Sequence, residues 1–205
     1  MDLTLEDGTF LVKLARRAVE RYLERGERIK PPEDTPSKLY DKRGVFVTIN
    51  EFLGGEKELR GCIGFPEPVL PLVEATIYSA ISAAFEDPRF PPLRKEELDR
   101  VVFEVSVLTP PELVKVRSPK EYLSEIRVGR DGLIVEKGSY KGLLLPQVPV
   151  EQKWSVEEFL SYACMKAGLM PDAWLDEDTK IYKFQAIVFE EEEPRGSVKL
   201  KELEG

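Results

Sequence analysis

The chain has 205 residues, of which 42% are hydrophobic and 33% are charged, and its formal net charge at pH 7 is −8. This length allows roughly 70% of the unfolded surface to be buried, enough for one domain or two subdomains that share a core. The absence of histidine excludes Cys-His and Ser-His nucleophile pairs and imidazole-based metal sites. No apolar run approaches the roughly 20 residues of a membrane helix, and the acidic balance gives no general attraction to nucleic acid.

The two cysteines, Cys62 and Cys164, lie far apart and fit no metal-binding spacing. We read them as free thiols in a reducing compartment, with a single bridge between them as the alternative. The amino-terminal residues lack the pattern of a signal peptide, so we expect a cytoplasmic protein. With no histidine, we expect no metal and no cofactor. Abundant charges and a single asparagine, Asn50, are typical of a thermophile.

The first half of the chain alternates between helical and extended patterns. Thr4 and Asp7 form a capping pair for an amphipathic helix that ends near Gly26. Beyond a proline-rich break, apolar residues alternate with polar ones, as they do in strands. We expect strands over 45–50 and 58–65, a helix over 69–84, a short helix over 95–100 and a strand over 101–108.

The second half begins with short apolar runs separated by turns, which predict strands over 126–128, 133–136 and 142–145. Ser155 and Glu158 form a capping box for a helix that Gly168 closes, and a last strand is expected over 182–189. The fold class is therefore α+β, with a mainly antiparallel sheet packed with helices and two subdomains forming a cleft. We assign 1–115 plus 150–190 to the main subdomain, 116–149 to a small inserted β-rich subdomain and 191–205 to an acidic tail.

The most distinctive segment is Leu59–Gly64, in which two glycines bracket Cys62. Alternation along a strand places Arg60 and Cys62 on one face and Leu59, Ile63 and Phe65 on the other. If the small subdomain folds over the polar face, a cleft lined by a thiol, a guanidinium, a carboxylate and a lysine results. By the same alternation in other strands, that polar face carries Thr48, Glu104, Ser106 and Lys183.

Two interpretations of Cys62 follow from this arrangement. In the first, Cys62 is a nucleophile or redox thiol, Arg60 favours its thiolate or holds an anionic substrate, and Glu104 moves protons. Glu104 opposes the thiolate, so the direction of the net effect stays open. In the second, the flanking glycines mark a bulge or tight packing and Cys62 fills a small gap. Cys164 lies on the apolar stripe of its helix, so we expect it to be packed.

Three further features are weaker. Arg89 stands in a proline-rich loop that either anchors the preceding helix or borders the cleft. Gln147 follows an apolar run and either forms a lip of the cleft or simply ends a strand. A basic face on the first helix offers a local RNA-binding patch, although such faces are usually only solvated. That face consists of Lys13, Arg16, Arg17 and Arg21.

The segment Leu59–Gly64 resembles the six-residue signature of the AMMECR family, named after a human chromosomal deletion syndrome with Alport syndrome, midface hypoplasia and elliptocytosis. The segments 87–92, 105–109 and 145–148 support the resemblance, whereas Phe65-Pro66 stands where Thr-Phe is expected. The resemblance implies an archaeal or bacterial member with a two-subdomain α+β fold and a cleft. It implies no known reaction, and it suggests association with Memo-like or radical-SAM proteins in a modification pathway.

We therefore expect a protein that binds a small molecule, a peptide or a protein partner around Leu59–Gly64. The lack of histidine, the lack of a cofactor motif and the acidic charge favour this function. The alternative is a cysteine-dependent enzyme that uses Cys62 with Arg60 and Glu104. RNA binding is the third possibility, and nucleic acid is the least expected partner.

Overall fold

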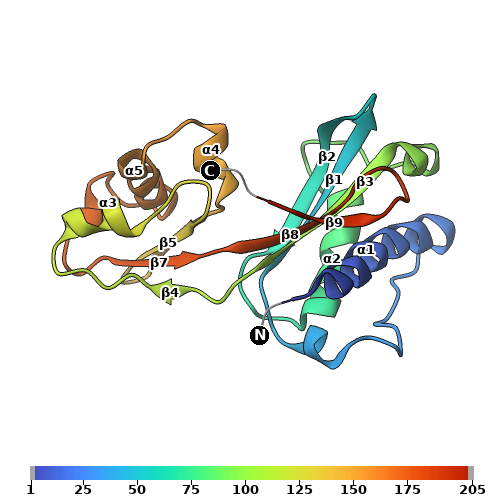
Figure 1. Ribbon diagram of the computed structural model, residues 1–205, viewed down its shortest axis with the longest axis horizontal. Coiled ribbons are helices and arrows are strands. Elements are labelled where there is room, and N and C mark those ends of the chain that lie inside the picture. The colour runs from blue at the N-terminus through green and yellow to red at the C-terminus, as the bar shows by residue number, and fades with distance from the viewer. Residues whose placement is uncertain (1–2, 203–205) are drawn as a thin grey trace. The chain divides into compact units, whose positions relative to one another are not determined.

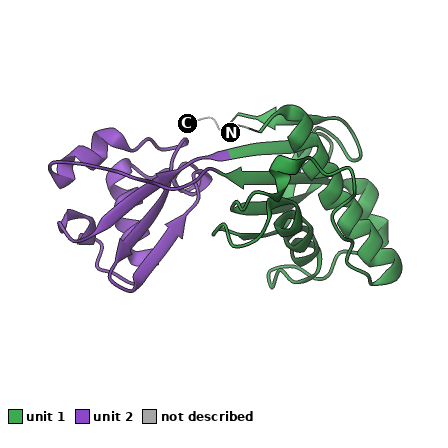
Figure 2. Cartoon of the chain, turned by 90° about the horizontal axis from the view of Figure 1, so that it is seen from below, with its two compact units in different colours: residues 1–108, 187–202 green, residues 109–186, 203–205 purple. Residues whose placement is uncertain are grey.

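The chain folds into two compact units, which a computed structural model describes for residues 3–202 (Figure 2). Unit 1 combines the residues up to Leu108 with the segment from Ile187 onward, and unit 2 holds Thr109–Ala186. Each unit has its own sheet and its own helices. Strand β1 pairs antiparallel with β2 and β3, β5 with β6 and β7, and β8 with β9, so the α+β fold class is confirmed. Among the described residues, no helix is long and apolar enough to cross a membrane.

Unit 1 is built on a five-stranded sheet with the strand order β2-β1-β3-β8-β9 (Figure 1). Two long helices pack against it, and both helices contact the central strands. A capping box of Thr4 and Asp7 starts the first helix, and Gly26 ends it in a left-handed conformation, as the sequence predicts. The elements of unit 1 are α1 (Leu5–Arg25), η1 (Ser37–Tyr40), β1 (Val45–Leu53), β2 (Glu56–Phe65), α2 (Leu72–Phe85), η2 (Lys95–Arg100), β3 (Val101–Leu108), β8 (Ala186–Glu191) and β9 (Val198–Lys201).

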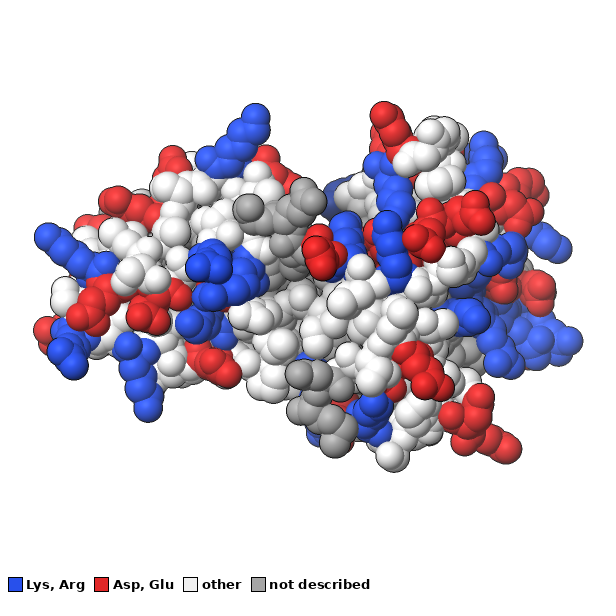
Figure 3. Space-filling model, viewed as in Figure 1, with Lys and Arg blue, Asp and Glu red and all other residues white. Residues whose placement is uncertain are grey.

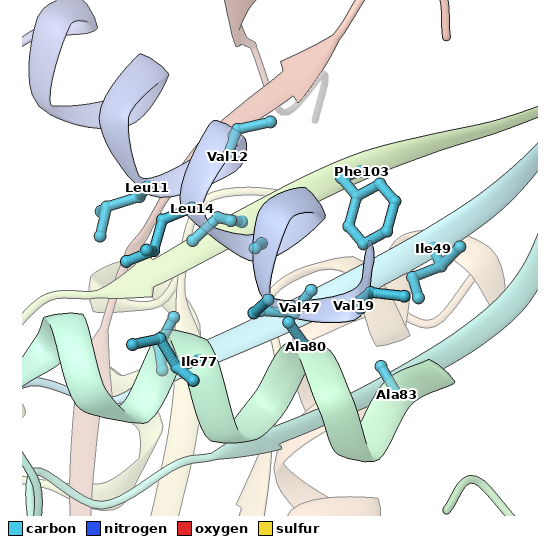
Figure 4. Close-up of a cluster of buried hydrophobic side chains, with 14 of the residues drawn as sticks. Leu11, Val12, Leu14, Val19, Val47, Ile49, Ile77, Ala80, Ala83 and Phe103 are labelled. Carbon is cyan, nitrogen blue, oxygen red and sulfur yellow. The ribbon is translucent and has the colours of Figure 1, made fainter. Parts of the chain in front are cut away.

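The core of unit 1 lies between these helices and the sheet. Apolar side chains of α1, α2, β1 and β3 point toward one another there (Figure 4). Leu11, Val47, Ile49, Ala80 and Phe103 are fully buried. Each large side chain of this kind contributes about 1.5–3 kcal/mol to folding, so the core fixes which sheet face meets the helices.

Unit 2 is built on a four-stranded sheet with the strand order β4-β7-β5-β6. Helix α5 packs on β5 and β6, where Phe159, Leu160 and Cys164 are fully buried together with Leu133 and Val135. The elements of unit 2 are β4 (Glu112–Leu113), η3 (Pro119–Glu121), α3 (Tyr122–Glu125), β5 (Gly132–Lys137), β6 (Tyr140–Leu144), α4 (Gln147–Glu151), α5 (Val156–Lys166), η4 (Ala173–Leu175) and β7 (Lys180–Phe184).

The boundaries of the two units differ from the expected 116–149 insertion. Helix α5 belongs to unit 2 because its apolar stripe is buried on β5 and β6 rather than on the main sheet. The single strand expected over 182–189 is divided at Gln185 into β7 of one sheet and β8 of the other. The cleft expected between two subdomains stays a prediction.

Two further local expectations are wrong. Residues 126–128 form no strand, because the buried Asp131 accepts a hydrogen bond from the Arg127 N–H and holds a turn there. The expected acidic tail, 191–205, includes strand β9, and Glu191 is buried against Arg16. Residues 203–205 of that tail lie outside the described residues.

Candidate functional site

The strand that carries Cys62 contains a β-bulge. Cys62 lies opposite Thr48 and Gly61 opposite Ile49, but the next residue of β1, Asn50, lies opposite Leu59. Arg60 is thus the extra residue, and one extra residue reverses the alternation beyond it. The prediction that Arg60 shares a face with Cys62 while Leu59 lies on the other face is therefore wrong.

Arg60 is engaged away from the thiol. Its Nε and Nη2 donate to the carboxylate of Glu97 at 2.8 and 3.2 Å, and Nη2 also donates to the Pro91 carbonyl at 2.9 Å. Burial raises the pKa of Glu97, but the hydrogen bonds from Arg60 and from the Arg94 N–H, together with the charges of both arginines, outweigh burial and hold that pKa below its usual range. The charged groups that act on the Cys62 thiol are Glu104, Arg89 and Asp87, and Arg60 is not among them.

A carboxylate and a guanidinium clamp the backbone of Cys62 at the outer edge of β2. The Cys62 N–H donates to Asp87 Oδ2 at 3.0 Å, and Arg89 Nη2 donates to the Cys62 carbonyl at 3.4 Å. Arg89 also donates to both oxygens of Asp87, from Nε at 3.0 Å and from Nη2 at 2.8 Å. These hydrogen bonds from Arg89 hold the pKa of the buried Asp87 carboxyl well below its usual range. The loop that follows α2 thereby closes the edge of the sheet at Cys62.

The two glycines beside Cys62 permit close approaches on opposite faces of β2. A Cβ at Gly61 would stand 2.1 Å from the Ala83 carbonyl oxygen of α2. A Cβ at Gly64 would stand 2.3 Å from the Val45 carbonyl oxygen and 2.6 Å from the Phe46 ring. Because no side chain tolerates such distances, both glycines serve close packing around Cys62.

The Cys62 thiol is half-buried and protonated at neutral pH. Burial raises its pKa, and the carboxylates of Glu104 and Asp87 raise it further. The Thr48 hydroxyl donates to Cys62 Sγ at 3.2 Å, and this bond and Arg89 only partly offset the increase. The net effect of these surroundings raises the pKa of Cys62 and so favours the thiol over the thiolate.

Glu104 and Ser106 lie beside Thr48 and Phe46 in the neighbouring strand β3, as the alternation predicts. Both are buried. Glu104 is held by Lys201 of β9, whose Nζ donates to Oε2 at 3.0 Å. The structure thus places Thr48 against Cys62 and Glu104 one strand further across the sheet, with the carboxylate already paired, whereas Ser106 lies in register with Phe46 and Gly64.

Comparisons with known proteins agree on one family. The sequence model of the AMMECR1 family matches residues 12–189. The chain belongs to the AMMECR1 family. It is 63% identical to Protein PH0010 of Pyrococcus horikoshii, covering 97% of this chain and 96% of that one. It is 59% identical to Protein MJ0810 of Methanocaldococcus jannaschii, with 98% of each chain covered. The crystal structure of the uncharacterized protein PH0010 superposes with a TM-score of 0.85 at 62% identity, covering 97% of this chain and 98% of that one.

Two predicted site residues of this AMMECR1-family chain lie in unit 2, whereas Cys62 lies in unit 1. Lys183 is in β7, where its Nζ donates to the Glu125 carbonyl at 3.3 Å. Strand β6 ends at Leu144, just before Pro146, as the strand-termination interpretation expects, and Gln147 is the first residue of α4. Its place at the lip of a cleft stays a prediction. Arg89 donates to the Cys62 carbonyl and leaves 55% of its side chain exposed, and its place at the border of a cleft stays a prediction.

Three residues that the sequence analysis did not single out pair with the charged residues of the predicted site. Asp87 pairs with Arg89, Glu97 with Arg60 and Lys201 with Glu104. Asp87 carries a weak signal, since a carboxylate two residues before an arginine in a proline-rich loop can form a local pair. Glu97 and Lys201 carry no such signal, because their pairing depends on chain segments that only the tertiary fold brings together.

The basic face expected on α1 is incomplete. Arg16 is buried and donates to both carboxylate oxygens of Glu191 at 2.7 Å, so it is not available to a phosphate backbone. On the molecular face shown in Figure 3, acidic and basic side chains are interspersed. Within residues 3–202 there is no cluster of three or more cysteine, aspartate or glutamate side chains that could hold a metal.

Proposed function

We propose that this AMMECR1-family protein binds a small molecule, a peptide or a protein partner at the surface around Cys62, and that it does not use Cys62 as a nucleophile. The observation that carries the proposal is that both charged groups expected to activate the thiol are held in ion pairs, and burial of the thiol, which raises its pKa, acts in the same direction. A reactive cysteine needs a cation or a base that stabilises the thiolate. Here Arg60 pairs with Glu97 and Glu104 pairs with Lys201, so both candidate activating groups are already engaged.

The exposed donor at this surface is Arg89. Its orientation is held by the two hydrogen bonds to Asp87, while more than half of its side chain contacts solvent. A guanidinium held in this way loses little conformational freedom on binding and suits a carboxylate or another anionic group. Thr48 and Cys62 add a hydroxyl and a neutral thiol beside it.

The clamp on Cys62 also restricts how a partner can bind. A peptide that adds a strand to a sheet needs free N–H and C=O groups along the sheet edge. At Cys62 both groups are already bonded to the Asp87–Arg89 pair. We therefore place the ligand on the sheet face beside Thr48 and Cys62, and not along the edge of β2.

The cellular location and the partners of the protein are proposed from its sequence. The two free cysteines support a cytoplasmic location. Association with Memo-like or radical-SAM proteins stays a prediction that rests on the family resemblance alone.

A titration followed by amide chemical shifts tests the binding proposal. The isotope-labelled protein is titrated with a panel of small carboxylates and short acidic peptides, in wild type, Arg89→Gln and the matched control Arg100→Gln, which changes an exposed arginine of η2. We expect saturable shifts at Thr48, Cys62 and Arg89, with affinity about tenfold weaker in Arg89→Gln and unchanged in Arg100→Gln. Binding that Arg89→Gln leaves intact would contradict the assignment of Arg89.

A further inference from the structure

Unit 2 contains a cavity of about 390 Å³ where strands β4 and β7 diverge. Leu113 still pairs with Tyr182, and the Val114 N–H donates to the Ile181 carbonyl at 2.9 Å. Beyond these contacts, the cavity is lined by residues 115–119 and by Tyr122, Asp176, Glu177, Thr179 and Lys180. Its volume is in the range typical of sites for small molecules. All of its lining residues belong to unit 2.

Three cations line this cavity without an ion-pair partner among residues 3–202: Lys115, Arg117 and Lys180. Two carboxylates, Asp176 and Glu177, also line it. Asp176 is already held by Lys137, whose Nζ lies 2.7 Å from its Oδ2. Three cations therefore face a single carboxylate that has no ion pair within the described chain, although the protein as a whole has a net charge of −8. This local excess of positive charge favours an anion.

Two buried residues of the lining carry hydroxyl groups without a hydrogen-bond partner among residues 3–202. Thr179 is 3% exposed, and its Oγ1 is buried with no partner in the described structure. Tyr122 is 7% exposed, and no other described residue hydrogen-bonds to its hydroxyl. Burial raises the pKa of Tyr122, so its hydroxyl keeps its proton and can donate. Buried hydroxyls are nearly always hydrogen-bonded, so the buried, unpaired Thr179 hydroxyl indicates a missing acceptor in this cavity, and the Tyr122 hydroxyl offers a second donor.

We propose that this cavity binds a small organic phosphate monoester. Phosphate oxygens accept hydrogen bonds from guanidinium, ammonium and hydroxyl donors, and the cavity supplies all three kinds. Val116 and Pro119 are half-buried in the same lining and offer a contact for the apolar part of such a ligand. This site is separate from the surface around Cys62 and does not rest on the function proposed for it.

The test uses phenyl phosphate as the probe, with phenol and inorganic phosphate as partial ligands, in calorimetric titrations of the full chain. We expect saturable binding of phenyl phosphate, weaker binding of inorganic phosphate and no binding of phenol. Arg117→Gln is expected to weaken the binding of phenyl phosphate about tenfold, and the matched exposed variant Arg127→Gln is expected to leave it unchanged. No saturable binding of phenyl phosphate, or binding that Arg117→Gln does not weaken, would overturn the proposal.

A second variant separates ligand binding from folding. Thr179→Val keeps the shape of the side chain and removes the unpaired hydroxyl. It is expected to weaken phenyl phosphate binding about tenfold while leaving the thermal midpoint of the ligand-free protein equal or higher. A clear fall in that midpoint would show that the hydroxyl has a structural partner, and would remove it from the proposed site.

Discussion

The surroundings of Cys62 in unit 1 and the cavity of unit 2 contain similar chemical groups, but they differ in how these groups are paired. Around Cys62 each nearby charge already has a partner, as in the Arg60–Glu97, Arg89–Asp87 and Lys201–Glu104 pairs. In the cavity, three cations and the buried hydroxyl of Thr179 lack partners among the described residues. The unusual motif Leu59–Gly64 therefore marks a site of close packing with a hydrogen-bonded backbone. The unpaired hydrogen-bond donors of the unit 2 cavity lie in segments that carry no recognisable motif.

The largest expected effect tests the close packing at Gly61. Gly61→Ala places a Cβ against the Ala83 carbonyl oxygen, so we expect the free energy of unfolding to fall by about 2–3 kcal/mol in guanidinium chloride titrations. Gly54→Asn is the control, because Gly54 has a φ of +60° with open space around it, and asparagine tolerates this conformation. We expect a change below about 0.5 kcal/mol for the control. Equal effects of the two substitutions would show that Gly61 is not a packing position.

A smaller effect tests the clamp on Cys62. Asp87→Asn weakens the bonds to Arg89 and to the Cys62 N–H, and we expect a loss of about 1–2 kcal/mol at neutral pH, since Arg89 is partly exposed. The pKa of Asp87 is lower in the folded state than the value of about 3.9 in the unfolded state. Its stabilising contribution is therefore complete above the unfolded pKa and is lost as the pH falls through the folded pKa.

Unfolding titrations of wild type and Asp87→Asn at a series of acidic pH values measure how the difference in their free energies of unfolding depends on pH. The gap between the two proteins should narrow as the pH falls below about 4. Asp34→Asn, which changes an exposed aspartate in a turn, should show no such gap. A gap that widens on acidification would contradict the direction given for Asp87.

A still smaller effect tests the pairing of Arg60. Arg60→Gln removes the partly buried pair with Glu97, so we expect a loss of about 1 kcal/mol in unfolding free energy. Glu97→Gln should cost a similar amount, and the double variant should cost little more than either single variant. Fully additive losses would show that the two side chains act independently.

The smallest expected effect concerns the cavity. Arg117→Gln and Lys180→Gln break no described ion pair, so each should change the free energy of unfolding by less than about 0.5 kcal/mol. Chemical denaturation of the ligand-free protein measures this. A loss above about 1 kcal/mol in the free energy of unfolding would show that the substituted cation has a structural partner. The charges of the cavity would then be paired, as the charges around Cys62 are.

Much of the fold could be predicted from local sequence signals. The capping boxes at Thr4 and Ser155 and the alternation of β3 depend on residues within one element, so the sequence predicts those elements closely. The boundary between the units could not be predicted in this way. Helix α5 is amphipathic in either unit, and only its packing on β5 and β6 decides where it belongs.

The candidate site also could be predicted only where local sequence signals decide the structure. Alternation correctly places Thr48 and Glu104 on one face of the sheet, and the register of the structure adds that Thr48 lies between Cys62 and Glu104. It fails at Arg60, because a single bulge residue shifts the register and the flanking glycine gives no unique indication of which residue is the extra one. The direction of the Cys62 pKa shift depends on burial and on Asp87, Arg89 and Glu104 together, so only the assembled structure determines it.

The most direct test of the account is the pH dependence of Cys62 alkylation by iodoacetamide, followed by mass spectrometry of the separate peptides. The raised thiol pKa predicts a midpoint above the value of about 8.5 for free cysteine, identical in Arg60→Gln. Cys164 is fully buried and its pKa is raised to about 11, so its peptide should label more slowly still. A Cys62 midpoint well below that of free cysteine, shifted upward in Arg60→Gln, would contradict the account and favour cysteine chemistry.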